Sequence, residues 1–211
     1  MKPLLGVACV LSAVLALHAV RNGGRPRRFF AFKPLTTLLI LGLAALAPAS
    51  TARAWMLAGL GLSLVGDVCL LFHGNRAFLG GLGSFLIAHL AFIAAFCGGV
   101  AAGPPPRWTL LLVPYALVLG GVLWRRTGAL RGPVLIYALV LLGMALAAAR
   151  AQAVLGTPAA AWGLAGALTF VVSDSLLAVD RFVHPHPRAQ VGILATYWAA
   201  LAGLVASLPG V

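Results

Sequence analysis

Long stretches without a charged side chain recur along this sequence, and they constrain its fold more than any other feature. A helix needs about 20 predominantly apolar residues to cross the hydrocarbon core of a bilayer. The chain has room for eight such helices, two of which are long enough only if an acidic residue, Asp67 or Asp174, is admitted into the apolar run. Turn-forming residues fall between them, as at Asn22-Gly23-Gly24 and Pro104-Pro105-Pro106. The predicted spans are residues 3–20, 34–52, 54–72, 78–101, 107–124, 132–150, 158–180 and 189–208.

The composition excludes the soluble classes of protein. Apolar residues make up 62% of the chain and charged residues only 9%, whereas a soluble domain is about 25% charged. A surface so poor in charge would not keep the protein in solution. Eight spans use about 160 residues, which leaves no room for a soluble domain. We therefore predict an all-α fold, a polytopic membrane protein whose residues 1–211 form a single transmembrane domain.

The basic residues predict the orientation of the helices. The net charge is +12, but the arginines lie between apolar runs and form no basic stripe that would bind nucleic acid. Eleven of the 15 Lys and Arg residues lie in or beside the odd-numbered loops, which places these loops in the cytoplasm and both termini on the opposite side. We expect an integral protein of the bacterial inner (cytoplasmic) membrane, with no nucleic acid partner.

Two aspartates are the most informative polar residues in the predicted spans. Asp67 and Asp174 lie in parallel helices, each roughly 8–9 Å from the cytoplasmic end. A carboxylate at that depth costs several kcal/mol, so it should face the bundle interior or a wet cavity. We predict a polar pocket that opens toward the cytoplasmic leaflet. Other polar side chains at similar depth are Lys33, which opens the second span, His89, Tyr137, Ser173 and Tyr197.

Each of these residues also has a structural interpretation. An intramembrane Asp can be held by a neighbouring hydroxyl, Lys33 can extend to the interface as an anchor, and His89 can be a hydrogen-bonded core residue. Asp180, beside Arg181 at a helix end, is interpreted as an interface residue. The histidines of His184-Pro185-His186-Pro187 are too few for a zinc site, which needs three or four convergent ligands. We expect no metal and no cofactor.

Several motifs follow one another along the chain in a recognisable order. They are Lys33-Pro34-Leu35-Thr36-Thr37, Gly66-Asp67, a run from Phe78 through Gly81 and Phe85 to His89, Tyr137, a run from Gly166 through Phe170 to Ser173-Asp174, and Tyr197. Together they resemble the YhhN/lysoplasmalogenase family of eight-helix membrane proteins. One departure is that members usually carry a Gln a few residues after the Tyr of the eighth helix. This chain has Ala199-Ala200-Leu201 there.

The resemblance implies hydrolysis of the vinyl ether bond of lysoplasmalogen, giving a fatty aldehyde and a glycerophospho-alcohol. The substrate is then a lysophospholipid in the lipid bilayer, and no obligatory protein partner is inferred. Such hydrolysis begins with protonation of an alkene carbon, so it needs one neutral carboxylic acid and one carboxylate nearby. Asp67 and Asp174 would form this pair. Lys33 would bind the headgroup phosphate, and His89, Tyr137, Ser173 and Tyr197 would line the substrate site.

Other functions remain open at this point. A small proton-coupled transporter also uses intramembrane Asp and His, although such proteins usually have helices broken by Gly or Pro, and no Pro lies close to Asp67 or Asp174. A non-catalytic scaffold would leave the matched depth of the two aspartates a coincidence. A hydrolase that acts on a different lysolipid with the same Asp pair is the third alternative.

Overall fold

The structure, a computed structural model, describes residues 2–21 and 27–210, and every regular element in these residues is a helix. Eight segments are long and apolar enough to cross a membrane, which confirms the predicted helix count. Two of them start with a 3₁₀ segment, Arg107–Leu111 before α5 and Gly128–Leu130 before α6. The α-helices are α1 (Lys2–Val20), α2 (Arg27–Ala45), α3 (Thr51–Cys69), α4 (Asn75–Cys97), α5 (Leu112–Trp124), α6 (Arg131–Leu155), α7 (Pro158–Phe182) and α8 (Ala189–Ala206).

Several helix ends differ from the predicted span limits. α2 begins at Arg27 instead of residue 34, so Lys33 and Pro34 lie inside the helix and do not open it. α6 likewise continues past Arg150 to Leu155. The predicted limits followed charge-free runs, but a charged side chain at the membrane surface does not end a helix. The turn predicted at Asn22-Gly23-Gly24 lies outside the described residues.

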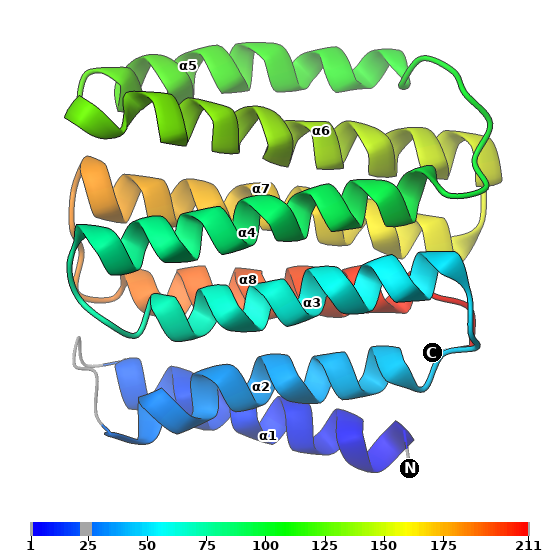
Figure 1. The fold of residues 1–211 in the computed structure, drawn as a ribbon, viewed down its shortest axis with the longest axis horizontal. Coiled ribbons are helices and arrows are strands. Elements are labelled where there is room, and N and C mark those ends of the chain that lie inside the picture. Colours follow the sequence, from blue (N-terminus) through cyan, green and yellow to red (C-terminus); the bar gives the residue numbers. More distant parts are fainter. Residues whose placement is uncertain (1, 22–26, 211) are drawn as a thin grey trace.

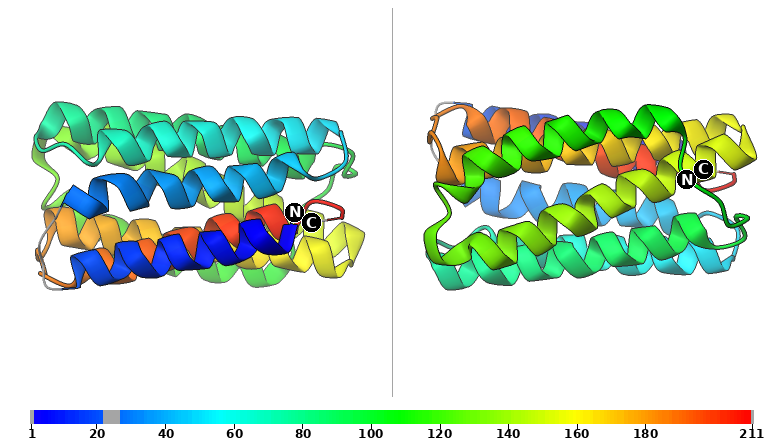
Figure 2. Two further views of the ribbon diagram at one scale, coloured as in Figure 1. Left: turned by 90° about the horizontal axis from the view of Figure 1, so that it is seen from below. Right: turned by 90° about the horizontal axis from the view of Figure 1, so that it is seen from above.

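Seven helices form a closed cycle of neighbours. α1 packs on α2, followed in turn by α3, α4, α6, α7 and α8, and α8 returns to α1 (Figure 1). α8 also contacts α2 and α3, so it fills the middle of the bundle. α5 lies outside the cycle against α6 and α7, as the two further views show (Figure 2).

Consecutive helices run in opposite directions, so α3 and α7 end at the same end of the bundle (Figure 1). α2, α4 and α8 begin at this end. Lys2 lies at the other end, where its ammonium donates to the carbonyl of Gly210. Asp67 and Asp174 are far apart in the sequence, and this topology brings them to the same end of the molecule.

Glycines set the spacing of the helices that carry the two aspartates. A Cβ atom on Gly166 of α7 would lie 2.6 Å from the backbone nitrogen of Leu204, and one on Gly203 of α8 would lie 2.8 Å from Cα of Gly166. A Cβ atom on Gly66 of α3 would lie 2.6 Å from the ring of Phe85 in α4. Small residues let membrane helices approach closely without a hydrophobic driving force. The helices beside Asp67 and Asp174 are therefore held in tight contact.

We predict that Gly166→Ala lowers the free energy of unfolding by about 1–3 kcal/mol, because an added methyl group would collide with backbone that cannot move aside. Thermal unfolding of the purified protein in detergent measures the effect. Gly61→Ala in α3 is the matched control, since a Cβ atom there has no neighbour within 4 Å. Equal stability of the two variants would contradict this account of α7–α8 packing.

Candidate active site

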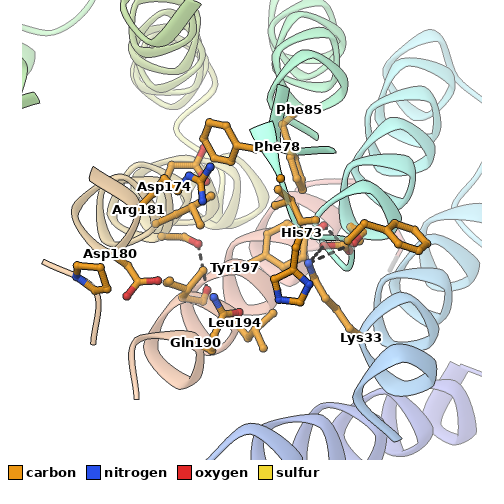
Figure 3. Close-up of a pocket in the computed structure, with 18 residues that line it drawn as sticks. Lys33, His73, Phe78, Phe85, Asp174, Asp180, Arg181, Gln190, Leu194 and Tyr197 are labelled. Atoms are coloured by element: carbon orange, nitrogen blue, oxygen red, sulfur yellow. Dashed lines mark hydrogen bonds and ion pairs between the residues drawn. The ribbon is translucent and has the colours of Figure 1, made fainter. Parts of the chain in front are cut away.

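A cavity of about 270 Å³ lies at the end of the bundle where α3 and α7 end and α2, α4 and α8 begin (Figure 3). We call it the main cavity. Leu70, Phe78, Phe85, Leu177 and Leu194 form much of its apolar wall. Both aspartates predicted from the sequence line it. Its polar lining consists of Lys33, Asp67, His73, Ser173, Asp174, Asp180, Arg181, Gln190 and Tyr197.

Asp67 is the centre of a fully satisfied buried network. The Lys33 ammonium lies 3.3 Å from Oδ1 of Asp67, and the two residues are only 5% and 1% exposed. Oδ2 accepts hydrogen bonds from Thr37 Oγ1 at 2.6 Å and from the Tyr197 hydroxyl at 2.9 Å. Trp198 Nε1 in turn donates to Thr37 Oγ1 at 3.3 Å. The carboxylate therefore joins α2, α3 and α8.

The position of Lys33 differs from the expected one at the start of the second span. Because α2 begins at Arg27, Lys33 lies well inside the helix, one turn before Thr37. Residues four apart share a helix face, so both side chains reach the same carboxylate. The spacing of Lys33 and Thr37 was the sequence signal for this contact, and sequence reasoning missed Thr37. Since Lys33 is buried and paired with Asp67, it is not an open cation for a headgroup.

Asp174 has a different environment at the opposite wall of the main cavity. Its side chain is 11% exposed, and its Oδ2 accepts a hydrogen bond from the Tyr137 hydroxyl of α6. Nε2 of His89 lies 3.9 Å from the same oxygen. Among the described residues, no Lys or Arg side chain lies within ion-pair distance of Asp174. Asp174 thus has one hydroxyl donor and no ammonium or guanidinium partner.

His89 lies behind Asp174 and does not line the main cavity. It is fully buried, and its ring meets the rings of Phe170 and Tyr137 edge-on, with centroids 4.6 Å and 5.4 Å apart. Within the described part of the chain, neither ring nitrogen forms a hydrogen bond of normal geometry. The imidazole therefore lies on the protein side of Asp174 and does not reach into the cavity.

The remaining predicted residues have mixed positions. Tyr197 lies at the main cavity and touches the rings of Phe85 and Phe170, with centroids 5.7 Å and 5.6 Å away. Ser173 also borders the cavity, but its hydroxyl donates to the carbonyl of Ile193 at 3.0 Å and so ties α7 to α8. Tyr137 borders a smaller cavity on the other side of Asp174.

The apolar residues after Tyr197 have a packing role. Ala200 and Leu201, which stand where the family resemblance predicts a Gln, are fully buried. The carbonyl of Ala200 lies against Gly166, only 2.8 Å from where a Cβ atom would be. In this chain, the side-chain amide that α8 contributes to the main cavity is Gln190.

Comparison with known proteins identifies related sequences. The profile of the YhhN family matches residues 28–208. The chain is 32% identical over 177 residues to the "Lysoplasmalogenase" of Mycobacterium tuberculosis, covering 81% of this chain and 66% of that protein. It is 36% identical over 138 residues to the human "Lysoplasmalogenase TMEM86B", covering 65% of this chain and 56% of that protein.

A third relative is similar in length. The "Uncharacterized membrane protein YhhN" of Escherichia coli is 34% identical over 181 residues, which cover 84% of this chain and 81% of that protein. The chain thus spans about two thirds of the mycobacterial relative and most of the one from E. coli. None of the solved structures matches the chain.

We predict that Lys33→Met lowers the free energy of unfolding by about 3–5 kcal/mol, because it leaves the buried Asp67 carboxylate without its cation. The double variant Lys33→Met, Asp67→Asn should recover part of this loss, since it removes both charges. Unfolding in detergent measures all three proteins, with the exposed Arg76→Met as the control. A double variant less stable than the single one would contradict a buried ion pair.

Proposed function

This chain belongs to the YhhN family, and from that membership we propose that it is a membrane-embedded hydrolase of lysoplasmalogen. It would cleave the vinyl ether bond to release a fatty aldehyde and a glycerophospho-alcohol. The observation that carries the proposal is that two largely buried carboxyl groups, Asp67 and Asp174, line the same cavity in unlike environments. The relatives named lysoplasmalogenase support the choice of substrate.

We assign the general acid to Asp174. The ammonium of Lys33 stabilises the charged form of Asp67, whereas Asp174 has no such partner among the described residues. A carboxyl group buried without a cation is best suited to hold a proton. Asp174 would transfer that proton to the alkene carbon of the vinyl ether, and the adjacent carbon would become an oxocarbenium ion. Tyr137, hydrogen-bonded to Asp174, would keep its carboxyl group oriented.

Asp67 would stabilise the positive charge and assist the attack of water. Its carboxylate is fixed by Lys33, Thr37 and Tyr197, so no reorganisation is needed when the charge develops. Water adds to the oxocarbenium carbon and gives up one proton to Asp67. The resulting hemiacetal breaks its carbon–oxygen bond to the glycerol. The glycerol oxygen takes the proton held by Asp67, and the hemiacetal hydroxyl gives its proton to Asp174 as the aldehyde forms, so both carboxyl groups return to their starting states. The balance is one water consumed for each aldehyde and alcohol released.

In the bound substrate, the hydrocarbon chain would extend out of the main cavity beside Asp174. Asp174 also lines a small apolar cavity of about 40 Å³ between α4, α6 and α7, which we call the side cavity. Val134 borders both the side cavity and an apolar groove of about 130 Å³ between α5, α6 and α7, which we call the α5 groove. This sequence of apolar spaces leads from the reacting carbons toward the lipid. It supports lateral entry of the substrate from the bilayer.

We also propose that the main cavity faces the cytoplasmic leaflet. Apart from Lys33, which is buried inside α2, the loops at this end of the bundle and the residues that flank them hold ten of the 15 basic residues, and cytoplasmic loops are enriched in Lys and Arg. α3 and α7 are continuous helices around Asp67 and Asp174, with Pro only in the first turn of α7. Unbroken helices at the acidic residues favour a hydrolase over a transporter built on broken helices.

We predict that purified wild-type protein releases fatty aldehyde from lysoplasmalogen and that Asp174→Asn lowers the rate by about 10²-fold or more, because the amide cannot transfer the proton. Thr169→Ala is the matched control on α7, since the Thr169 hydroxyl bonds only within its own helix, to the carbonyl of Ala165. Thermal unfolding checks that each variant folds. Full activity in a folded variant with both Asp67→Asn and Asp174→Asn would rule out the mechanism.

We predict that Val134→Trp selects for shorter chains, because the indole would fill the junction between the side cavity and the α5 groove. KM for a long-chain substrate should rise about tenfold, within the range by which pocket size discriminates substrates. A short-chain substrate should be affected little. Ile136→Trp is the control on the exposed face of α6, outside both spaces. An equal rise in KM for the long-chain and the short-chain substrate would show that the hydrocarbon chain of the substrate does not lie at this junction.

A further inference from the structure

Arg181 places an uncompensated positive charge at the opening of the main cavity. Its guanidinium stacks over the ring of Phe78, 4.9 Å from the centroid (Figure 3). Its Nη2 donates to Oδ1 of Asn75 at 2.8 Å. Both partners are neutral, and no carboxylate lies within ion-pair distance of Arg181 in the described part of the chain. The side chain is therefore held in place with its charge and several N–H donors still available.

Asp180 places an uncompensated negative charge at the same opening. One of its oxygens, Oδ1, accepts the backbone N–H of His186 at 2.8 Å, which fixes the carboxylate against the connection to α8. No Lys or Arg side chain within the described residues forms an ion pair with it. Although Asp180 and Arg181 are adjacent, they do not neutralise each other. The opening thus presents one fixed cation and one fixed anion to the same cavity.

From this arrangement we infer that the opening of the main cavity binds a zwitterionic lysolipid headgroup, with the phosphate at Arg181 and the ammonium at Asp180. The inference rests on the proposed function, whose substrate carries such a headgroup. A guanidinium matches the oxygens of a phosphate with paired hydrogen bonds, and a carboxylate matches an ammonium. His73 and Gln190, which also line the opening, add neutral polar groups. Lys33, paired with Asp67, does not have this role.

The separation along α7 fits a glycerophospholipid. Arg181 follows Asp174 by seven residues, so the two lie on the same helix face about 10 Å apart along the axis. The phosphorus and the vinyl ether carbon of a lysoplasmalogen are separated by the glycerol backbone, roughly 7 Å when extended. The long side chain of Arg181 can reach back over the roughly 3 Å by which the separation along the helix exceeds that in the substrate. A phosphate at Arg181 therefore places the vinyl ether at the depth of Asp174.

Three substrates that differ in their headgroups test separately the assignment of the phosphate to Arg181 and of the ammonium to Asp180. They are an alkenylglycerol without phosphate, an alkenylglycerol phosphate, and an alkenylglycerophosphoethanolamine. Arg181→Gln should raise KM about tenfold or more for the two substrates that carry phosphate and leave KM for the alkenylglycerol unchanged. Asp180→Asn should raise KM only for the ethanolamine substrate. Arg76→Gln is the matched control, an exposed arginine at the same end that does not line the main cavity.

The stability of the variants is tested alongside. If Arg181→Gln fails to fold, Arg181→Lys takes its place, because it keeps the charge but loses the paired hydrogen bonds. That variant should raise KM for the phosphate-bearing substrates by a smaller factor. Loss of activity by the same factor on all three substrates would show a structural role for Arg181 and overturn the inference.

A binding measurement separates this inference from the proposed function. Glycerophosphoethanolamine, which has no vinyl ether bond, should raise the unfolding temperature of the wild type and of Arg76→Gln, but not that of Arg181→Gln. If this stabilisation occurs while no aldehyde forms from any substrate, the proposed reaction fails and the headgroup site stands. If aldehyde forms and glycerophosphoethanolamine stabilises all three proteins equally, the reaction stands and Arg181 does not bind the headgroup.

Discussion

The ion pair between Lys33 and Asp67 joins α2 to α3 where both side chains are almost entirely buried. Removing two charges from water costs several kcal/mol for each, and their attraction offsets this only when the remaining hydrogen-bonding groups are also satisfied. Thr37 and Tyr197 meet that condition for the carboxylate and draw α8 into the same contact. The central position of α8 and the shape of the main cavity both depend on this one buried charge pair.

Aromatic rings keep the second carboxyl group in separate surroundings. Tyr197 touches Phe85 and Phe170, and Phe170 touches His89. These rings fill the space behind the cavity with groups that have few alternative positions in a close-packed interior. Asp67 therefore keeps its donors, and Asp174 keeps an environment without a neighbouring ammonium. A single cavity can then hold two carboxyl groups that do not act alike.

The sequence was sufficient for the number of helices and for the common end of the two aspartates, because both follow from apolar length and alternating direction. It was not sufficient for Lys33, since its burial depends on α2 starting at Arg27, and charged residues beside a span give no sharp signal for a helix end. The interpretation of Asp180 as an interface residue did not include its contact with the loop before α8. Nor could the sequence place α5 outside the cycle of seven, because its apolar composition matches that of the other spans.

The closed cycle of helices also has a consequence for how the protein enters a membrane. α8 completes the cycle, yet it follows all the other helices in the chain, so Tyr197 reaches Asp67 only after α2 and α3 are in place. These two helices are consecutive and antiparallel, and they carry the opposite charges that form the pair. They can therefore insert together as a hairpin whose net charge in the bilayer is already cancelled. The ion pair between Lys33 and Asp67, which later shapes the cavity, would thus first lower the cost of inserting these two charged side chains into the lipid.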